Sequence, residues 1–162
     1  IQRAVSKRGF KPISNLTGHK VERYVLHTGK SIPNVPDING AKIAVDEVFA
    51  VEPFVTVSTG EGRVESLDRG YILRFNKEKG VKTQRAKEIL RLIREEYRSL
   101  PFALRWLRRR FQGIDLDPVF KELVSSRCVV SYPVLVEASG KVVTQAEHTV
   151  TVKENGSEVL TI

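Results

Sequence analysis

Three polar residues, His19, Glu52 and Glu147, occupy positions where a purely structural pattern favours apolar side chains. Glu52 interrupts the apolar run FAVEPF, and a buried carboxylate is costly unless it is paired, neutralised or bound to a metal. One histidine nitrogen and two glutamate oxygens would form part of a ligand shell for Co, Mn, Fe or Zn. The spacing lacks the short HExxH and zinc-ribbon signatures, so it does not by itself establish a metal site.

Each of these residues also has a structural interpretation. His19 could be a loop residue bonded to backbone, Glu52 a strand-end ion pair and Glu147 a solvent-facing strand position, because structural ion pairs also place carboxylates on strands. Alternation in TQAEHTV puts Glu147 on the face of Gln145 and turns His148 to the other face. We therefore do not expect Glu147 and His148 to act as a joint ligand pair.

The segments around these three residues have residue patterns typical of β-strands. The segment Val45–Val57 is rich in β-branched and aromatic residues, which predicts a strand with a kink or edge at Pro53. VERYVLH is predicted to be the most extended piece of the region 10–36, and VVSYPVLVEA and KVVTQAEHTVTV alternate in strand fashion. Asn155 and Gly156 predict a hairpin before the last strand.

Helical patterns appear at the start of the chain and in its middle. Residues 1–8 are predicted to be a helix end capped by Gly9. The period becomes helical after Thr83, a predicted N-cap, and further helices are predicted over 103–110 and from Asp117, which precedes Pro118. The apolar positions of the first of these helices are Ala86, Ile89, Leu90, Ile93 and Tyr97.

The order of strands, helices and strands predicts an α+β fold in three segments. Residues 1–82 would form the first part of the domain, 83–128 a helical insert and 129–162 the strands that complete it. The length fits one domain with a real core. Because the chain begins within a predicted helix and contains no methionine, we expect it to be part of a longer protein.

Composition bears on whether the protein is a membrane, secreted or nucleic-acid-binding protein. No run of about 18 apolar residues and no secretory leader is present, which predicts a cytoplasmic protein with no membrane partner. Cys128 in RCVVSY is expected to be a buried thiol. The net charge of +8 is concentrated between Arg85 and Arg110, which is typical either of a solvated helix face or of a surface that contacts ribosomal RNA.

Several strings, in order along nearly the whole chain, resemble the C-terminal half of type 2 methionine aminopeptidases, particularly the archaeal ones. These strings are NLTGHKVERYVLHTGKSIPN, DEVFAVEPF, SLPFALRWL, SYPVL and QAEHTVTV. The resemblance implies half of a pita-bread (creatinase/aminopeptidase) fold, an α+β fold that encloses two divalent metal ions, with the helical insert that separates type 2 from type 1 enzymes. It also implies a partner, the N-terminal half of the same enzyme, which would supply two aspartate ligands.

The resemblance further implies roles for individual residues. His19, Glu52 and Glu147 would be three of five metal ligands, with Glu147 bridging the ions. His27 would contact the substrate or stabilise the tetrahedral intermediate, and Tyr132 would help line the methionine pocket. A water activated by two metals would cleave the initiator methionine from nascent polypeptides, with Glu52 moving the proton and His27 donating to the oxyanion.

Three alternatives remain at this point. His27 and Tyr132 could simply be a packed strand histidine and a core aromatic residue. The whole protein could be a non-catalytic pita-bread homologue that binds RNA or protein, although such a relative is expected to lose metal ligands. A proline-specific peptidase of the same superfamily is disfavoured by the insert and by the segment HTGKSIPN.

Overall fold

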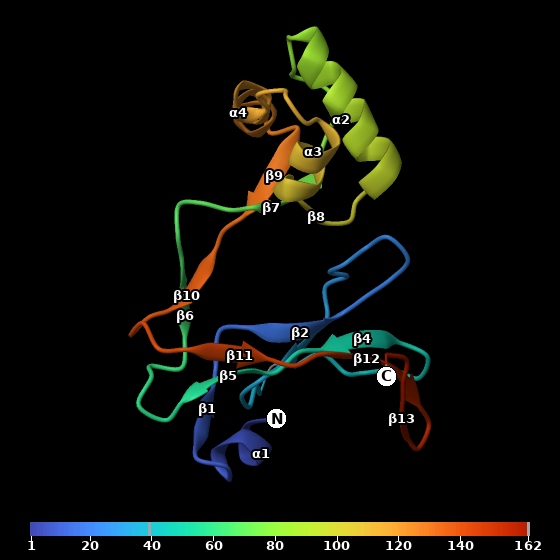
Figure 1. Cartoon of the computed structure of the whole chain (residues 1–162). Helices are drawn as coiled ribbons and strands as arrows, with labels where there is room; N and C mark the ends of the chain where they lie inside the picture. The colour runs from blue at the N-terminus through green and yellow to red at the C-terminus, as the bar shows by residue number, and fades with distance from the viewer. Residues whose placement is uncertain (39, 162) are drawn as a thin grey trace. The chain divides into compact units, whose positions relative to one another are not determined.

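The computed structural model describes residues 1–38 and 40–161, and the chain divides into two units. The first unit combines Ile1–Glu65 with Leu135–Ile162, and the second consists of Ser66–Val134 (Figure 1). The second unit is therefore inserted into the first along the sequence. It contains the predicted helical insert 83–128 together with strands on either side of it, and the boundaries predicted at 82 and 128 stay a prediction.

Antiparallel strands and one short helix build the first unit. They are α1 (Gln2–Ser6), β1 (Phe10–Pro12), β2 (Thr17–Lys20), β3 (Ser31–Pro33), β4 (Val48–Val51), β5 (Phe54–Val57), β6 (Val64–Ser66), β10 (Leu135–Glu137), β11 (Val143–Gln145), β12 (His148–Lys153) and β13 (Gly156–Val159). A five-stranded sheet has the order β13-β12-β4-β2-β3, a three-stranded sheet has the order β1-β5-β11, and β6 pairs with β10.

The two central strand segments of this unit are both interrupted. The predicted strand 45–57 is present as β4 and β5, separated by Glu52 and Pro53, because proline has no amide hydrogen to donate to a ladder. KVVTQAEHTVTV is likewise two strands, β11 and β12, separated by Ala146 and Glu147. The register continues across the gap, but the single strand predicted there is two strands, because β11 pairs with β5 and β12 pairs with β4. The break in one strand therefore extends to its partner.

The segment VERYVLH is a turn, so its prediction as an extended piece was wrong. Glu22 and Val25 exchange backbone hydrogen bonds of 3.0 and 2.9 Å around Tyr24, whose φ of 61° ends the extended backbone. The extended residues lie just before it, in β2. The loop between β2 and β3 therefore presents His27 from irregular backbone.

The C-terminal hairpin is present, one residue earlier than predicted. Lys153 pairs with Gly156, so Glu154 and Asn155 make the turn and Gly156, at φ +145°, opens β13. Glycine tolerates this backbone conformation because it has no Cβ.

Three strands and three helices build the second unit. They are β7 (Ile72–Phe75), α2 (Gln84–Tyr97), β8 (Phe102–Ala103), α3 (Leu104–Arg110), α4 (Asp117–Ser125) and β9 (Val129–Tyr132), with strand order β8-β7-β9. The three helices predicted within this unit are confirmed, and Thr83 Oγ1 accepts a hydrogen bond of 3.3 Å from the Ala86 amide as the predicted N-cap. Cys128 is fully buried in the apolar core of this unit, as predicted.

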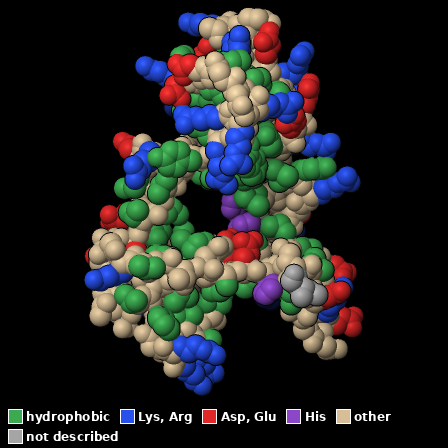
Figure 2. Space-filling model, viewed as in Figure 1, with side chains coloured by type: hydrophobic (Ala, Val, Ile, Leu, Met, Phe, Trp, Pro, Cys, Tyr) green, Lys and Arg blue, Asp and Glu red, His purple; other side chains and the backbone are tan. Residues whose placement is uncertain are grey.

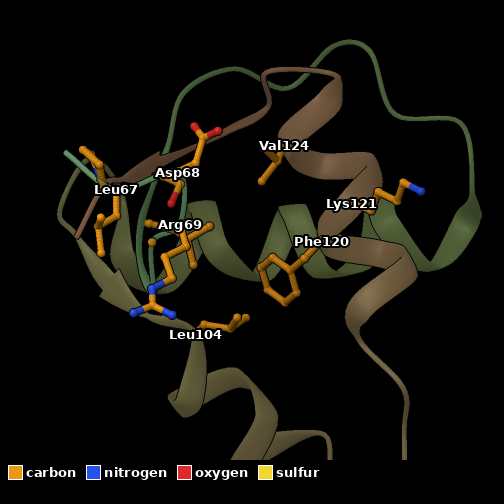
Figure 3. Close-up of a pocket in the computed structure, with 11 residues that line it drawn as sticks. Leu67, Asp68, Arg69, Leu104, Phe120, Lys121 and Val124 are labelled. Atoms are coloured by element: carbon orange, nitrogen blue, oxygen red, sulfur yellow. The ribbon is translucent and has the colours of Figure 1, made fainter.

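A hollow of about 480 Å³ lies within the second unit (Figure 3). Leu73, Leu104 and Phe120 are among its apolar lining residues, and Arg69 and Lys121 are among its charged ones. The residues that line it all belong to the second unit, whereas His19, His27, Glu52 and Glu147 belong to the first. Within residues 1–38 and 40–161, no helix combines the length and apolar character needed to cross a membrane.

Candidate metal centre

Glu52 and Glu147 lie opposite each other where the central ladder is interrupted. Val51 pairs with His148 on one side of the break and Phe54 pairs with Gln145 on the other, so the same register sets Glu52 across from Glu147. Residues directly opposite in an antiparallel pair have Cβ atoms about 4.5 to 5.5 Å apart, and like charges there are destabilising. This position therefore calls for a compensating positive or hydrogen-donating group.

His19 supplies one such group from the neighbouring strand. It lies on β2 opposite Ala50 of β4, and its Nε2 is 3.0 Å from Glu52 Oε1, with the two side chains 12% and 14% exposed. The preceding Gly18 permits this approach, because a Cβ there would lie only 2.3 Å from the Ala50 carbonyl oxygen. Nδ1 of His19 is buried and has no hydrogen-bond partner among the described residues.

Gln145 supplies the second group and was missed by the sequence reasoning. Its Nε2 donates to Glu52 Oε2 at 3.3 Å and to Glu147 Oε2 at 3.1 Å, so one amide connects both carboxylates. The signal was available, since alternation places Gln145 on the same face as Glu147. Its role as a shared donor depends on the pairing of two strands that are far apart in sequence.

Burial and charge both act on Glu52. Burial raises the pKa of the Glu52 carboxyl above its ordinary value, and the charge of Glu147 raises it further, while His19 and the hydrogen bond from Gln145 oppose the shift. A divalent cation bound here would relieve both the repulsion between the carboxylates and the cost of burying one of them. The electrostatics thus favour a cation beside Glu52.

The donor types fit part of a metal site. A histidine nitrogen and two carboxylates suit borderline divalent ions such as Mn, Co, Fe and Zn. Among the described residues, however, no group of three or more His, Cys, Asp or Glu side chains converges as a metal-binding cluster. His19 and Glu52 are in direct contact, and Glu147 is joined to Glu52 through Gln145.

The other predicted site residues fall in two places. The ring centroid of His27 lies 4.1 Å from that of His19, so the loop after β2 brings this second histidine to the same site. Tyr132 ends β9 in the second unit, where it pairs with Ile72, and its role in substrate binding stays a prediction. His148 Nδ1 donates to the Thr161 carbonyl oxygen at 2.6 Å, consistent with its exclusion as a ligand partner of Glu147.

The basic helices of the second unit are partly neutralised by acidic neighbours. Figure 2 shows Lys and Arg side chains interspersed with Asp and Glu on the visible face. The ion pairs include Arg94 with Glu78, Arg110 with Glu96, and Arg108 with Asp117. No ion pair to a described residue is found for Arg85, Lys87, Arg105 and Arg109.

Sequence comparison finds archaeal methionine aminopeptidases. The chain is 43% identical to the enzyme of Methanothermobacter thermautotrophicus over 161 residues, which is 99% of this chain and 53% of that protein. It is 40% identical to the enzyme of Methanocaldococcus jannaschii over 162 residues and 41% identical to that of Pyrococcus horikoshii over 163 residues, again with 99% of this chain covered and 53% and 54% of those proteins. The chain thus spans about half the length of these relatives, and no family model matches it.

Structural comparison concerns the fold alone, because the identities are low. A thermophilic Arx1 matches 98% of this chain and 42% of its own length, with a TM-score of 0.79 and 20% identity. The methionine aminopeptidase of Rickettsia prowazekii matches 99% of this chain and 40% of its own length, with a TM-score of 0.51 and 17% identity. The predicted half of an α+β pita-bread fold is confirmed, and the chain is homologous to archaeal methionine aminopeptidases over about half of their length.

Proposed function

We propose that this chain belongs to the methionine aminopeptidase family and forms the C-terminal part of an enzyme that removes the initiator methionine from nascent polypeptides. The N-terminal part of that enzyme would be its partner and the cytoplasm its location. His19, Glu52 and Glu147 would hold a pair of divalent ions together with ligands from the partner. When bound, the ions would lower the pKa of a water molecule and polarise the scissile carbonyl group.

The residues of this chain would then handle protons and developing charge. Glu52 has a raised pKa, which makes its carboxylate a better proton acceptor near neutral pH. Glu52 would take the proton of the attacking water and deliver it to the leaving amine. His27 would donate a hydrogen bond to the oxyanion, while Tyr132 would contact the methionine side chain.

One observation carries the proposal more than any other. Two carboxylates face each other across a paired interruption, a histidine nitrogen lies 3.0 Å from one of them, and no Lys or Arg of the described chain pairs with either. Such an arrangement is costly in a protein without a cation. The similarity to methionine aminopeptidases over 99% of the chain gives that cation its chemical context.

The test is the variant Glu147→Ala in the protein extended to the full length of its relatives. We expect Mn²⁺ or Co²⁺ binding, measured by calorimetry, to weaken strongly and methionine release from Met-Ala-Ser to be lost. Glu154→Ala is the matched control, because Glu154 lies in the exposed turn between β12 and β13. Wild-type metal affinity and turnover in Glu147→Ala would refute the assignment of Glu147.

A second candidate is a non-catalytic pita-bread homologue that binds RNA or protein. The observation in its favour is a set of basic residues in the second unit that form no ion pair with a described residue. Its RNA contact would use the basic residues without ion pairs, Arg85, Lys87, Arg105 and Arg109, and would weaken steeply with salt. Metal-independent RNA binding by a protein without peptidase activity would support this candidate.

A further inference from the structure

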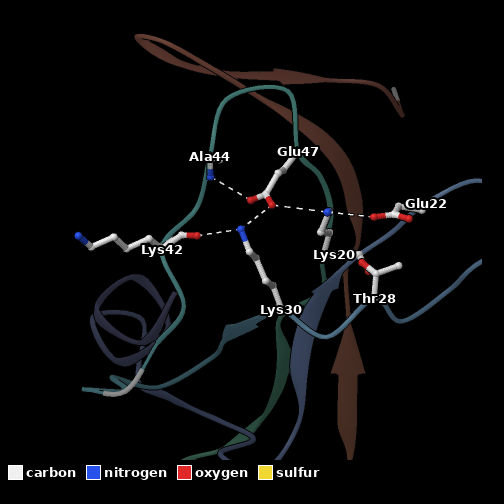
Figure 4. Close-up of polar contacts among 7 residues, drawn as sticks. All are labelled: Lys20, Glu22, Thr28, Lys30, Lys42, Ala44 and Glu47. Carbon is white, nitrogen blue, oxygen red and sulfur yellow. Dashed lines mark hydrogen bonds and ion pairs between the residues drawn. The ribbon is translucent and has the colours of Figure 1, made fainter.

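The loop that carries His27 is tied at both ends to one carboxylate. Lys20 precedes this loop and Lys30 follows it, and their Nζ atoms lie 3.5 and 2.5 Å from Oε1 of Glu47 (Figure 4). The two lysines are also joined through their backbones, because the Lys20 amide donates to the Lys30 carbonyl oxygen at 2.9 Å. Thr28, next to His27, donates to the Lys20 carbonyl oxygen from both its amide and its hydroxyl group.

Glu47, directly before β4, is itself held by further contacts. Its Oε2 accepts a hydrogen bond of 2.9 Å from the Ala44 amide, and its side chain is only 13% exposed. Lys30 Nζ also donates to the Lys42 carbonyl oxygen at 3.0 Å, so the segment before β4 is held by the same ammonium group that binds Glu47. The hydrogen bond from Lys30 is the main cause that lowers the pKa of the Glu47 carboxyl, so the group stays ionised at neutral pH.

Glu47 is connected to the candidate metal centre through strand β4. Glu47 immediately precedes β4, and Glu52 immediately follows that strand. A contact from Glu47 to the ends of the His27 loop therefore fixes the loop relative to β4, the strand that Glu52 directly follows. The ring of His27 lies 4.1 Å from that of His19 in the resulting arrangement.

We propose that Glu47 is a positioning residue that fixes the His27 loop against His19. The assignment of a role in the reaction rests on the proposed aminopeptidase function, whereas the fixing of the loop does not. Glu47 differs from an ordinary surface partner such as Glu22, which pairs with Lys20 but is 56% exposed. Exposed pairs contribute little, whereas hydrogen bonds to charged groups with restricted solvent access contribute more.

The experiment compares Glu47→Gln with Glu22→Gln by NMR in the 162-residue chain. In Glu47→Gln we expect the Thr28 amide to exchange with solvent on the order of tenfold faster and the contact between the His19 and His27 rings to be lost. The Val21 amide, which donates to the Val48 carbonyl oxygen at 2.9 Å, should exchange as in the wild type because the sheet stays paired. Glu22→Gln should behave as the wild type throughout.

A second variant covers the case in which Glu47→Gln does not fold. Lys30→Met leaves the Glu47 contact to Ala44 in place and removes the ammonium group that binds both Glu47 and the Lys42 carbonyl oxygen. Wild-type Thr28 exchange and an intact ring contact in both Lys30→Met and any folded Glu47→Gln would overturn the inference. A loosened loop in either variant supports it.

Activity of the full-length protein separates this inference from the proposed function. If Glu47 positions His27 for the reaction, Glu47→Gln should lower kcat on Met-Ala-Ser with little change in KM. An unchanged kcat despite a loosened loop would overturn the positioning role. A wild-type protein without peptidase activity would instead refute the proposed function, and the NMR result would still decide whether Glu47 fixes the loop.

Discussion

The substitution Gly18→Ala should separate His19 from Glu52 without changing either residue. Gly18 lies in β2, and an added Cβ would sit 2.3 Å from the Ala50 carbonyl oxygen, whereas ordinary van der Waals contact begins near 3.4 Å. Strand β2 must therefore withdraw from β4 by about 1 Å. The distance of 3.0 Å between His19 Nε2 and Glu52 Oε1 would then exceed hydrogen-bonding range.

The expected cost follows from two opposing effects. Overpacking a tight site costs about 1 to 3 kcal/mol. Replacing glycine with alanine also restricts the unfolded chain, which returns roughly 0.4 to 1 kcal/mol. The midpoints of these two ranges give a net loss of about 1.3 kcal/mol, which corresponds to roughly a tenfold change in the local opening equilibrium.

Hydrogen exchange measures this change at the strand pair itself. The Val21 amide donates to the Val48 carbonyl oxygen at 2.9 Å, directly after β2, and should exchange about tenfold faster in Gly18→Ala. Gly40→Ala is the control, because the nearest described atom to its Cβ would be the Asp37 carbonyl oxygen at an ordinary 3.7 Å. Unchanged Val21 exchange in Gly18→Ala would refute the argument that close approach at Gly18 positions His19.

Two further predictions concern carboxylates of the first unit. Gln145→Leu removes the shared donor, so the pKa of Glu52 should rise further in an NMR titration; an unchanged value would show that Gln145 does not stabilise the anion. Hydrogen bonds, chiefly from Ser139, lower the pKa of Glu137 from 4.5 to about 2, so its stabilising contribution is complete above the unfolded-state pKa and is lost as the pH falls through about 2. Urea unfolding between pH 6 and 2 should therefore show a steeper loss of stability in the wild type than in Glu137→Gln, and parallel curves would contradict this.

Local sequence signals predicted the helices well. The apolar positions of α2 recur at helical spacing over 14 residues, and Thr83 supplies a cap whose hydroxyl accepts from Ala86. Both signals act within a few residues of each other. Neither depends on which part of the chain packs nearby.

Strand interruptions were predicted less well because their cause is not local. Pro53 is a local signal for the break after β4, and the sequence analysis predicted a kink or edge at this residue. Nothing within KVVTQAEHTVTV marks the break at Ala146 and Glu147, because that break is set by pairing with the strand that contains Pro53. The turn at Tyr24 was missed for a related reason, since bulky residues rarely adopt positive φ and the residue types favour strand.

The same interruption explains why two carboxylates can lie opposite each other at the candidate site, which a regular strand ladder would disfavour. Within the break, the Ala146 amide still donates to the Pro53 carbonyl oxygen at 3.3 Å, so the two strands stay together while Glu52 and Glu147 leave the regular ladder. A pair selected for stability alone would place opposite charges or apolar side chains across the strands. Two glutamates joined by one neutral amide, with an imidazole beside one of them, leave negative charge to be balanced, and a bound cation would balance it.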